Sequence, residues 1–240
     1  MFRRVASRLL FASAVAVVLL SRTALPAEEK KADNPAVKLM NRDIPRHKKF
    51  LEIAKKGDVD VLFLGDSITE GWEGAGKAEW KKNFEPLKAA NFGIGGDQTG
   101  HVLWRLTEGK ELEGINPKVA VIMIGTNNGH NSAEEVAGGI EAIVAELRKQ
   151  KPECKILLLG IFPRSEKPTD KVRDKIKTVN ARISKLDDGK QVIFRDIGEK
   201  FLDKEGVLNT DIMPDRLHLS PKGYTIWAEA ILPDVEKLLK

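Results

Sequence analysis

The sequence has little cysteine and little histidine, and both shortages argue against whole classes of function. Cys154 is the one cysteine among 240 residues, so no disulfide can form within the chain and its core alone must stabilise it. It precedes an apolar run, where we expect a packing residue rather than a reactive thiol. The four histidines form no H-E-x-x-H pattern and no cysteine pair is present, which argues against a zinc site. We predict neither a metal nor another cofactor.

A hydrophobic run long enough to span a membrane is also missing. The apolar stretch at residues 9–20 has 12 residues, whereas a bilayer span needs about 20. Three arginines precede this stretch, and small residues follow it as far as Ala27. The pattern is typical of a secretory signal peptide over residues 1–27. We therefore expect export, to the periplasm or as a secreted protein, and no stable membrane anchor.

The excess of positive charge lies largely in the same leader. The full chain has a formal net charge of +5, but residues 1–27 contain four arginines and no acidic residue. The rest of the chain has 36 basic and 35 acidic residues, a balance that gives no support to nucleic-acid binding. Residues 28–42 are polar and contain a proline, so we expect a flexible lead-in. One domain is then expected over residues 43–240.

Beyond this lead-in the chain alternates between two hydrophobic patterns. Near-continuous apolar runs, typical of strands buried on both faces of a parallel sheet, occupy residues 59–65, 90–95, 118–125, 155–162 and 191–197. Helical spacing follows Ser132, which has Glu135 in the capping-box position. Similar spacing covers residues 168–186 and residues 220–239, the latter with a kink or break at Pro233. The alternation predicts an α/β fold with helices on both faces of the sheet.

The stretch VLFLGDSITEGW, residues 61–72, ends an apolar run with Asp66 and Ser67. One interpretation is structural, because Ser67 and Glu70 have the spacing of a capping box at a helix start. The other is chemical, because functional side chains gather at the carboxyl ends of parallel strands and a serine there is placed as a nucleophile. The chemical interpretation requires partner residues after other strands.

Candidate partners do follow other predicted elements. Gly96 follows the second strand, where a glycine either brings a backbone N–H to a substrate oxygen or forms a plain turn. Asn127 follows the third strand, where its amide either donates to an oxyanion or caps a turn. Asp215 and His218 are three residues apart, a spacing that lets the carboxylate orient an imidazole next to a serine. The alternative is that His218 is a surface or core histidine whose hydrogen bonds are satisfied and which has no catalytic role.

Other motif matches are incomplete. The stretch GWEGAGKA has phosphate-loop spacing as far as Lys77, but Ala78 replaces the Ser or Thr that binds magnesium. In GIGGDQTG, Gln98 takes the place of the last glycine of a dinucleotide-binding fingerprint. The residues around Ser67 do not form the G-x-S-x-G elbow of ordinary α/β-hydrolases. The sequence therefore gives poor support to nucleotide binding and to that hydrolase fold.

Together the four loops resemble the SGNH (GDSL-type) hydrolase family, whose name combines Ser, Gly, Asn and His. Three segments are similar to the catalytic alpha subunits of type I platelet-activating factor acetylhydrolase: NFGIGGDQTGHVLWRL, GTNNGHNSAEEVAGGIEAIV and DRLHLSPKGY. The resemblance covers about residues 45–240. It implies a flavodoxin-like three-layer α/β/α sandwich with a parallel sheet of about five strands, and no metal.

The resemblance also implies roles for particular residues. Carried over by position, Ser67 corresponds to the nucleophile, His218 to the general base and Asp215 to the residue that orients it. The oxyanion hole of the family corresponds to the backbone N–H groups of Ser67 and Gly96 with the side chain of Asn127.

The expected substrate is an ester with a small acyl group. Ile68 and Leu217 are bulky and directly flank the nucleophile and the base, and Trp72 is a candidate for a substrate groove. Ile68 stands where the family name implies leucine. We expect a serine esterase for short-chain, chiefly acetyl, esters, free or linked to polysaccharide. A lysophospholipase, a thioesterase or a non-catalytic binding protein on this scaffold is the alternative, and a homodimer is left open.

Overall fold

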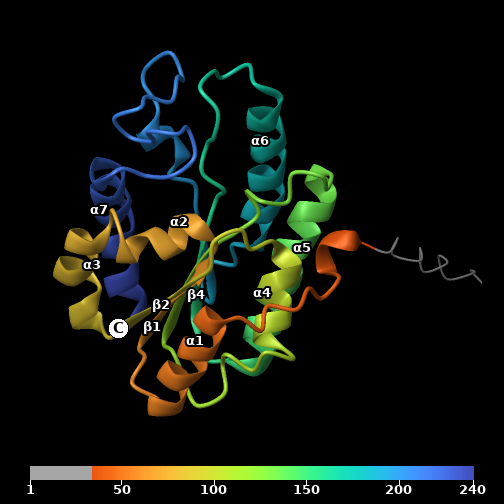
Figure 1. Cartoon of the computed structure of the whole chain (residues 1–240), viewed down its shortest axis with the longest axis vertical. Helices are drawn as coiled ribbons and strands as arrows, with labels where there is room; N and C mark the ends of the chain where they lie inside the picture. The colour runs from red at the N-terminus through yellow and green to blue at the C-terminus, as the bar shows by residue number, and fades with distance from the viewer. Residues whose placement is uncertain (1–33) are drawn as a thin grey trace, which may run out of the picture. The chain divides into compact units, whose positions relative to one another are not determined.

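Five parallel strands form the centre of the part of the chain that the structure, a computed structural model, describes, residues 34–240. They are β1 (Val61–Gly65), β2 (Ala89–Gly93), β3 (Val119–Met123), β4 (Lys155–Leu159) and β5 (Val192–Arg195) (Figure 1). Their order in the sheet is β2-β1-β3-β4-β5, the flavodoxin-like arrangement. Register pairs Val61 with Ala89 on one side and with Val119 on the other. The predicted fold class and the five predicted strands are confirmed.

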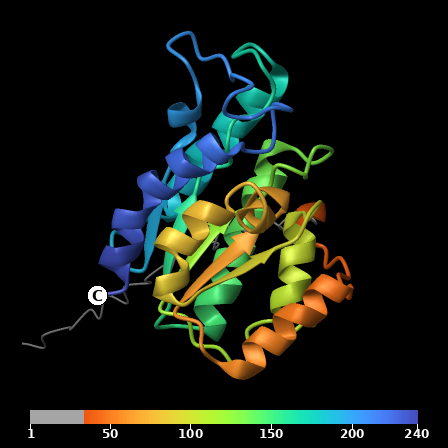
Figure 2. The ribbon, with the colours of Figure 1, turned by 60° about the vertical axis from the view of Figure 1, so that its left-hand side comes forward.

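Helices cover both faces of this sheet (Figures 1 and 2). One face packs against α1 (Pro45–Lys56), α4 (Thr99–Leu106), α5 (Ala133–Gln150) and α6 (Lys171–Ile183). The other face packs against α2 (Ser67–Glu70), α3 (Lys77–Asn83) and α7 (Pro221–Leu238). Short 3-10 helices span Pro35–Val37, Gly71–Glu73, Glu85–Leu87, Ser184–Leu186 and Gly198–Phe201.

Strand β1 shows why two cores form. Successive side chains of a strand point to opposite faces of the sheet. Leu62 and Leu64 accordingly belong to the core beneath α4 and α5, whereas Val61 and Phe63 belong to the core beneath α7. All of these side chains are buried, so β1 must be apolar at every position rather than at alternate ones.

The longer helices lie where the sequence predicts them. The predicted capping box is present at α5, where the Ser132 hydroxyl accepts the N–H of Glu135 and the Glu135 carboxylate accepts the N–H of Ser132. The predicted break at Pro233 is wrong, because α7 continues through it as one helix. Pro233 is exposed, and so is Glu229, whose carbonyl loses its helical partner and faces water instead.

The glycines of GWEGAGKA have a packing role. A Cβ at Gly71 would stand 2.0 Å from the Tyr224 hydroxyl, and one at Gly76 would stand 2.7 Å from the Tyr224 ring. Tyr224 of α7 is buried there, and its Oη donates to the carbonyl of Ile68 at 2.6 Å. The spacing that resembled a phosphate loop thus makes room for a tyrosine.

The predicted flexible lead-in is wrong for residues 34–42, which we call the N-terminal strap. The strap is tied to the domain, because Asn34 donates to the carbonyl of Glu135 at 3.0 Å and Thr99 donates to the carbonyl of Ala36 at 2.7 Å. The predicted signal peptide at residues 1–27 lies outside the described residues. Within residues 34–240, no helix has the length and apolar character that a membrane span requires.

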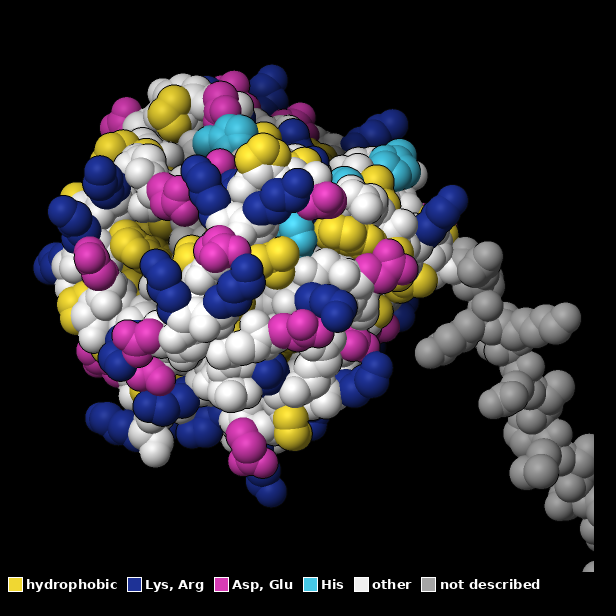
Figure 3. Space-filling view, turned by 60° about the horizontal axis from the view of Figure 1, so that its bottom comes forward, with side chains coloured by type: hydrophobic (Ala, Val, Ile, Leu, Met, Phe, Trp, Pro, Cys, Tyr) yellow, Lys and Arg dark blue, Asp and Glu magenta, His cyan; other side chains and the backbone are white. Residues whose placement is uncertain are grey.

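The surface shown in Figure 3 mixes positive and negative side chains without a field of one sign. Leu39 of the strap is the one large hydrophobic side chain that is exposed among residues 34–240. The single cysteine, Cys154, is a core residue, as predicted, and the tryptophans of two helices, Trp104 and Trp227, are also buried.

Candidate active site

The loop after β1 places Ser67 at the first position of α2. Asp66 caps this helix, since its carboxylate accepts the N–H of Ile68 at 3.0 Å. The predicted capping box between Ser67 and Glu70 is therefore wrong: Asp66 holds the position that Ser67 was expected to fill. The Glu70 carboxylate instead accepts the N–H of Gly95 at 2.6 Å and joins α2 to the loop after β2. The Ser67 hydroxyl is left available for another partner.

That partner is His218, in the loop before α7. The Ser67 Oγ lies 2.9 Å from His218 Nε2, and His218 Nδ1 lies 2.6 Å from Asp215 Oδ2. The bond to the carboxylate favours the tautomer with its proton on Nδ1, which leaves Nε2 to accept the serine proton. The structure thus brings together the three residues that the sequence singled out from two distant segments.

The loop around Asp215 holds the imidazole in place. Asp215 Oδ1 accepts the N–H groups of Leu217 at 3.0 Å and of His218 at 2.7 Å. The chain reverses at Arg216, which has a left-handed φ of 63°. Partial burial tends to raise the pKa of Asp215, but hydrogen bonds from the His218 backbone and side chain and from Leu217 outweigh it, so the pKa is lowered. The carboxylate stays ionised at neutral pH.

The three predicted oxyanion donors follow three adjacent strands. Ser67 comes after β1, Gly96 after β2 and Asn127 after β3, so the sheet order brings their loops to one edge. Within residues 34–240, no hydrogen bond occupies the backbone N–H of Ser67 or of Gly96. Asn127 uses one amide N–H to donate to the carbonyl of Asp97 at 3.0 Å, which leaves its second N–H for a ligand.

The predicted acyl-pocket residues are placed differently. Trp72 is fully buried among Phe63, Tyr224 and Trp227, so its assignment to a substrate groove is wrong. Ile68 is 1% exposed and belongs to the same core, so it offers almost no surface to a substrate. These two residues are four apart and therefore share the inner face of one helical stretch. Leu217 is half-buried beside His218, and its role in the pocket stays a prediction.

Comparison with known proteins decides the family. Residues 63–226 match the model of the GDSL-like lipase/acylhydrolase family. The chain belongs to this family. The chain is 45% identical to human platelet-activating factor acetylhydrolase IB subunit alpha2 over 186 residues. The aligned region covers 77% of this chain and 79% of that protein. It is 41% identical over 181 residues to the rat alpha1 subunit, which covers 75% of this chain and 76% of that protein. The predicted resemblance is confirmed.

Solved structures agree on the fold. A GDSL-like lipase from Bacteroides thetaiotaomicron matches with a TM-score of 0.65 and 26% identity, over 80% of this chain and 97% of that one. A carbohydrate acetylesterase from Sinorhizobium meliloti, 20% identical, shares the fold with a TM-score of 0.56 over 75% of this chain and 99% of that one. Given the family and its relatives named acetylhydrolases, the acylhydrolase is a carboxylic ester hydrolase.

Sequence reasoning missed a buried charge cluster behind the acylhydrolase's candidate oxyanion loop. Asp97, Arg105 and Glu111 are fully buried, and His47 is 3% exposed with its Nδ1 at 2.7 Å from Glu111 Oε1. Burial raises the pKa of Asp97 to about 6, although Arg105 and Arg42 act in the opposite direction. Arg105 lies among apolar residues on the inner side of α4, and a charge within an apolar stripe was the available signal.

Asp66 is a second buried carboxyl group, directly before Ser67. Burial raises its pKa to about 7, the negative charge of Asp97 adds to this, and the N–H of Ile68 and the charge of His218 act against it. Its Oδ2 has no hydrogen-bond partner within residues 34–240. The group therefore titrates near neutral pH, with its acidic form favoured by the surroundings.

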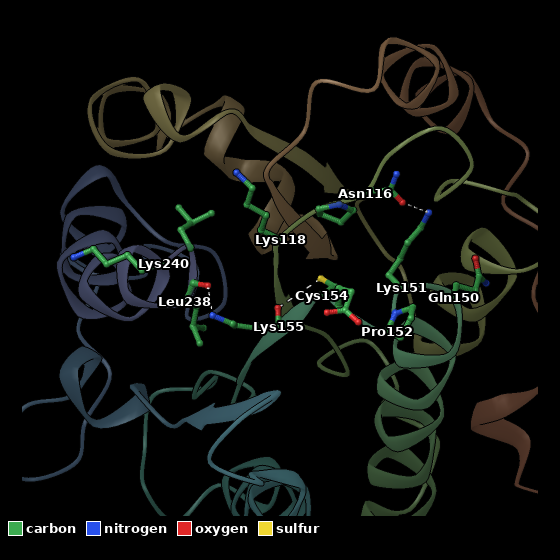
Figure 4. Close-up of a pocket in the computed structure, with 12 residues that line it drawn as sticks. Asn116, Lys118, Gln150, Lys151, Pro152, Cys154, Lys155, Leu238 and Lys240 are labelled. Carbon is green, nitrogen blue, oxygen red and sulfur yellow. Dashed lines mark hydrogen bonds between the residues drawn. The ribbon is translucent and has the colours of Figure 1, made fainter.

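A cavity of about 350 Å³ lies at the opposite edge of the sheet (Figure 4). It is lined by residues before β3 and β4 and by the last residues of the chain, including Asn116, Lys151 and Leu238. None of the candidate site residues lines it. Within residues 34–240 the structure groups no three metal-ligating side chains.

Proposed function

We propose that the protein is a serine esterase that hydrolyses short-chain, chiefly acetyl, carboxylic esters through Ser67, His218 and Asp215. The observation that carries the proposal is the continuous chain of contacts from hydroxyl to imidazole to carboxylate, at 2.9 Å and 2.6 Å. Such a chain lets a neutral imidazole remove the serine proton as the hydroxyl attacks.

The reaction then has two halves. His218 takes the Ser67 proton while Oγ bonds to the ester carbonyl carbon, and the imidazolium returns this proton to the departing alcohol. An acyl-enzyme remains on Ser67. His218 next removes a proton from water, which attacks the acyl carbon, and Ser67 leaves with the proton as the acid is released. The ionised Asp215 stabilises the imidazolium in both halves.

In each half, negative charge develops on the former carbonyl oxygen. The free N–H groups of Ser67 and Gly96 and the second amide N–H of Asn127 supply donors for it. Gly96 has a left-handed φ of 79°, a conformation that glycine adopts without strain and that sets the direction of its N–H. Removal of one such donor typically lowers the rate about 100- to 1000-fold.

Acetyl specificity is supported by the relatives rather than by the predicted pocket walls. The alpha1 and alpha2 subunits that resemble the chain at 41–45% identity are named acetylhydrolases. Ile68 and Trp72 no longer support a small pocket as exposed walls, so Leu217 remains the chain's own candidate. The substrate is then either an acetylated sugar or polysaccharide, or an acetylated phospholipid, which the name of those relatives favours, and the leaving group is the alcohol part of that substrate.

Activity of purified Ser67→Ala on nitrophenyl acetate tests the proposal. We expect its hydrolysis to be abolished, whereas the matched control Ser184→Ala, at a half-buried serine directly after α6, keeps full activity. A fluorophosphonate probe should label the parent protein and the control but not Ser67→Ala. Full activity of Ser67→Ala would sink the assignment.

The acyl and alcohol parts need separate substrate series. Esters from acetate to octanoate should show a rate maximum at acetate, and a preference for octanoate would refute the acetyl proposal. Acetylated xylan and an acetylated glycerophospholipid, compared at equal ester concentration, distinguish the two leaving groups.

We further propose that the enzyme works outside the cytoplasm, as the leader at residues 1–27 suggests. The mature protein should begin near Glu28, and N-terminal sequencing of exported protein tests this. Recovery of the uncleaved chain in the cytoplasmic fraction would contradict it.

A further inference from the structure

Asp97 stands between two arginines in the loop after β2. Arg42 Nε donates to Asp97 Oδ1 at 2.7 Å, and Arg105 Nε lies 3.0 Å from Asp97 Oδ2. Asp97 and Arg105 are fully buried. Moving charged groups out of water costs free energy. A buried ion pair therefore gives the fold little or no more stability than apolar residues of similar size would give in its place. Because this ion pair lies beside the candidate site, we expect it to serve the site rather than stability.

The backbone of Asp97 links two of the oxyanion donors. Its carbonyl accepts the amide N–H of Asn127 at 3.0 Å, and the residue directly follows Gly96. Its own N–H donates to the carbonyl of Ile94 at 3.1 Å, which closes the turn. A displacement of Asp97 would therefore move the Gly96 peptide and release the Asn127 side chain at the same time.

The two arginines fix this turn to its neighbours. Arg105 donates to the carbonyl of Phe92 at 2.9 Å and to the carbonyl of Gly65, two residues before the nucleophile, at 3.3 Å. Arg42 donates to the carbonyl of Gly95 at 2.5 Å. Glu111, at 2.8 Å from Arg105, provides a second negative charge for the buried guanidinium. Arg105 thereby holds the ends of β1 and β2, and Arg42 holds the loop that follows β2.

Arg42 reaches the site because the strap holds it there. The N–H of Met40 donates to the carbonyl of Gly100 at 3.1 Å, and a Cβ at Gly100 would stand 2.2 Å from the carbonyl oxygen of Lys38. The strap therefore lies directly on the start of α4. Its last residue delivers a guanidinium to the oxyanion loop.

We propose that Asp97, held by Arg42 and Arg105, is a positioning residue that aligns both the Gly96 N–H and the Asn127 amide for the developing oxyanion. The proposal rests on the proposed function and assigns a catalytic dependence to the N-terminal strap. It predicts that a residue of the strap affects turnover without touching the substrate.

The variant Arg42→Gln tests this in the full chain, because Arg42 is partly exposed and its loss should leave the fold intact. We expect kcat for an acetate ester to fall roughly tenfold with KM unchanged, since the oxyanion donors act on the transition state. Arg42→Lys should recover part of the loss. The matched control Arg195→Gln breaks a two-bond pair with Asp234 beside α7 and should keep the parent kcat.

A second comparison separates positioning from general structure. Because Asp97 positions both donors, the fold-loss caused by Arg42→Gln should become smaller in an Asn127→Ala background, where only the Gly96 N–H remains to be misaligned. An equal fold-loss in both backgrounds, or no loss in the parent, overturns the proposal. Asp97→Asn should behave like Arg42→Gln with a larger loss, and its melting temperature reports whether it folds.

The proposed function and the positioning role of Asp97 can fail separately. If Ser67→Ala keeps its activity, the proposed function falls and the positioning role falls with it. If Ser67→Ala is inactive but Arg42→Gln and Asp97→Asn, both folded, keep the parent kcat, only the positioning role falls.

Discussion

The polar groups at the two edges of the parallel sheet differ in burial and in how they are paired. At the carboxyl edge, Asp66, Asp97 and Arg105 are fully buried, and Asp97 and Arg105 pair with each other. At the amino edge, two of the lysines that line the cavity of Figure 4 bind separate partners: Lys151 binds Asn116, and Lys155 binds the carbonyl of Leu238. Convergence and burial of polar groups, rather than the volume of a cavity, therefore mark the edge where the candidate site residues lie.

The largest expected effect at the carboxyl edge comes from Asp215→Asn. An amide in this position favours the wrong imidazole tautomer and removes the charge that stabilises the imidazolium, so kcat should fall roughly 10³- to 10⁴-fold. The melting temperature should change little, because Asp215 is exposed. Esterase kinetics with acetate esters measure this. A loss below tenfold would show that His218 works without its carboxylate.

The next effect concerns stability and pH. The pKa of Asp66 is raised from 3.8 to about 7 by burial, so the stability that its protonated form provides is present below about pH 4 and is lost as the pH rises to about 7. Three units correspond to roughly 4 kcal/mol at most. Asp66→Asn should therefore unfold with a smaller decline in free energy between pH 5 and pH 8 than the parent. Urea titrations at both pH values measure this, and parallel declines would contradict it.

A smaller effect is expected where α7 contacts the nucleophile's helix. Tyr224→Phe removes the hydrogen bond to the Ile68 carbonyl but keeps the ring, so the free energy of unfolding should fall by about 1 kcal/mol. The rate should fall a few-fold as α2 loosens. Thermal melting and ester kinetics of the one variant give both numbers. An unchanged melting temperature would mean that water replaces the hydroxyl at no cost.

The smallest effect is expected at the amino edge. Lys151→Ala removes a partly exposed hydrogen bond to Asn116, and we expect a stability change within about 0.5 kcal/mol and an unchanged kcat/KM. The same edge holds Cys154, whose thiol has its pKa raised to about 12 by burial and should resist alkylation in the native state. A several-fold loss of activity in Lys151→Ala would overturn the contrast between the two edges.

Much of the fold was readable because its strands are buried on both faces. Their apolar runs are continuous and bounded by glycines and polar residues, so periodicity located all five. The cap at Ser132 was equally local. The same reasoning predicted a break at Pro233 and was wrong there, since a proline breaks a helix less readily where the carbonyl that loses its hydrogen bond faces water.

The sequence predicted the candidate site residues in the loops but not the residues that hold those loops in place. Ser67, Gly96 and Asn127 could be predicted, because each follows a strand of the parallel sheet. The pairing of Asp97 with Arg42 joins segments 55 residues apart, and no local pattern encodes it. The strap was mistaken for a tether, because its polar composition does not reveal the contacts that the side chains of Asn34 and Arg42 and the backbone of Met40 make with the domain.

The aromatic packing beneath α7 has an optical consequence. Trp72 lies 4.7 Å from Trp227 and 6.0 Å from Trp80, measured between ring centroids, so three of the four tryptophans share one cluster. Trp227 belongs to the helix that begins just after His218. Intrinsic fluorescence of the unlabelled chain thus reports mainly on the docking of that helix, and so on the part of the chain that follows His218.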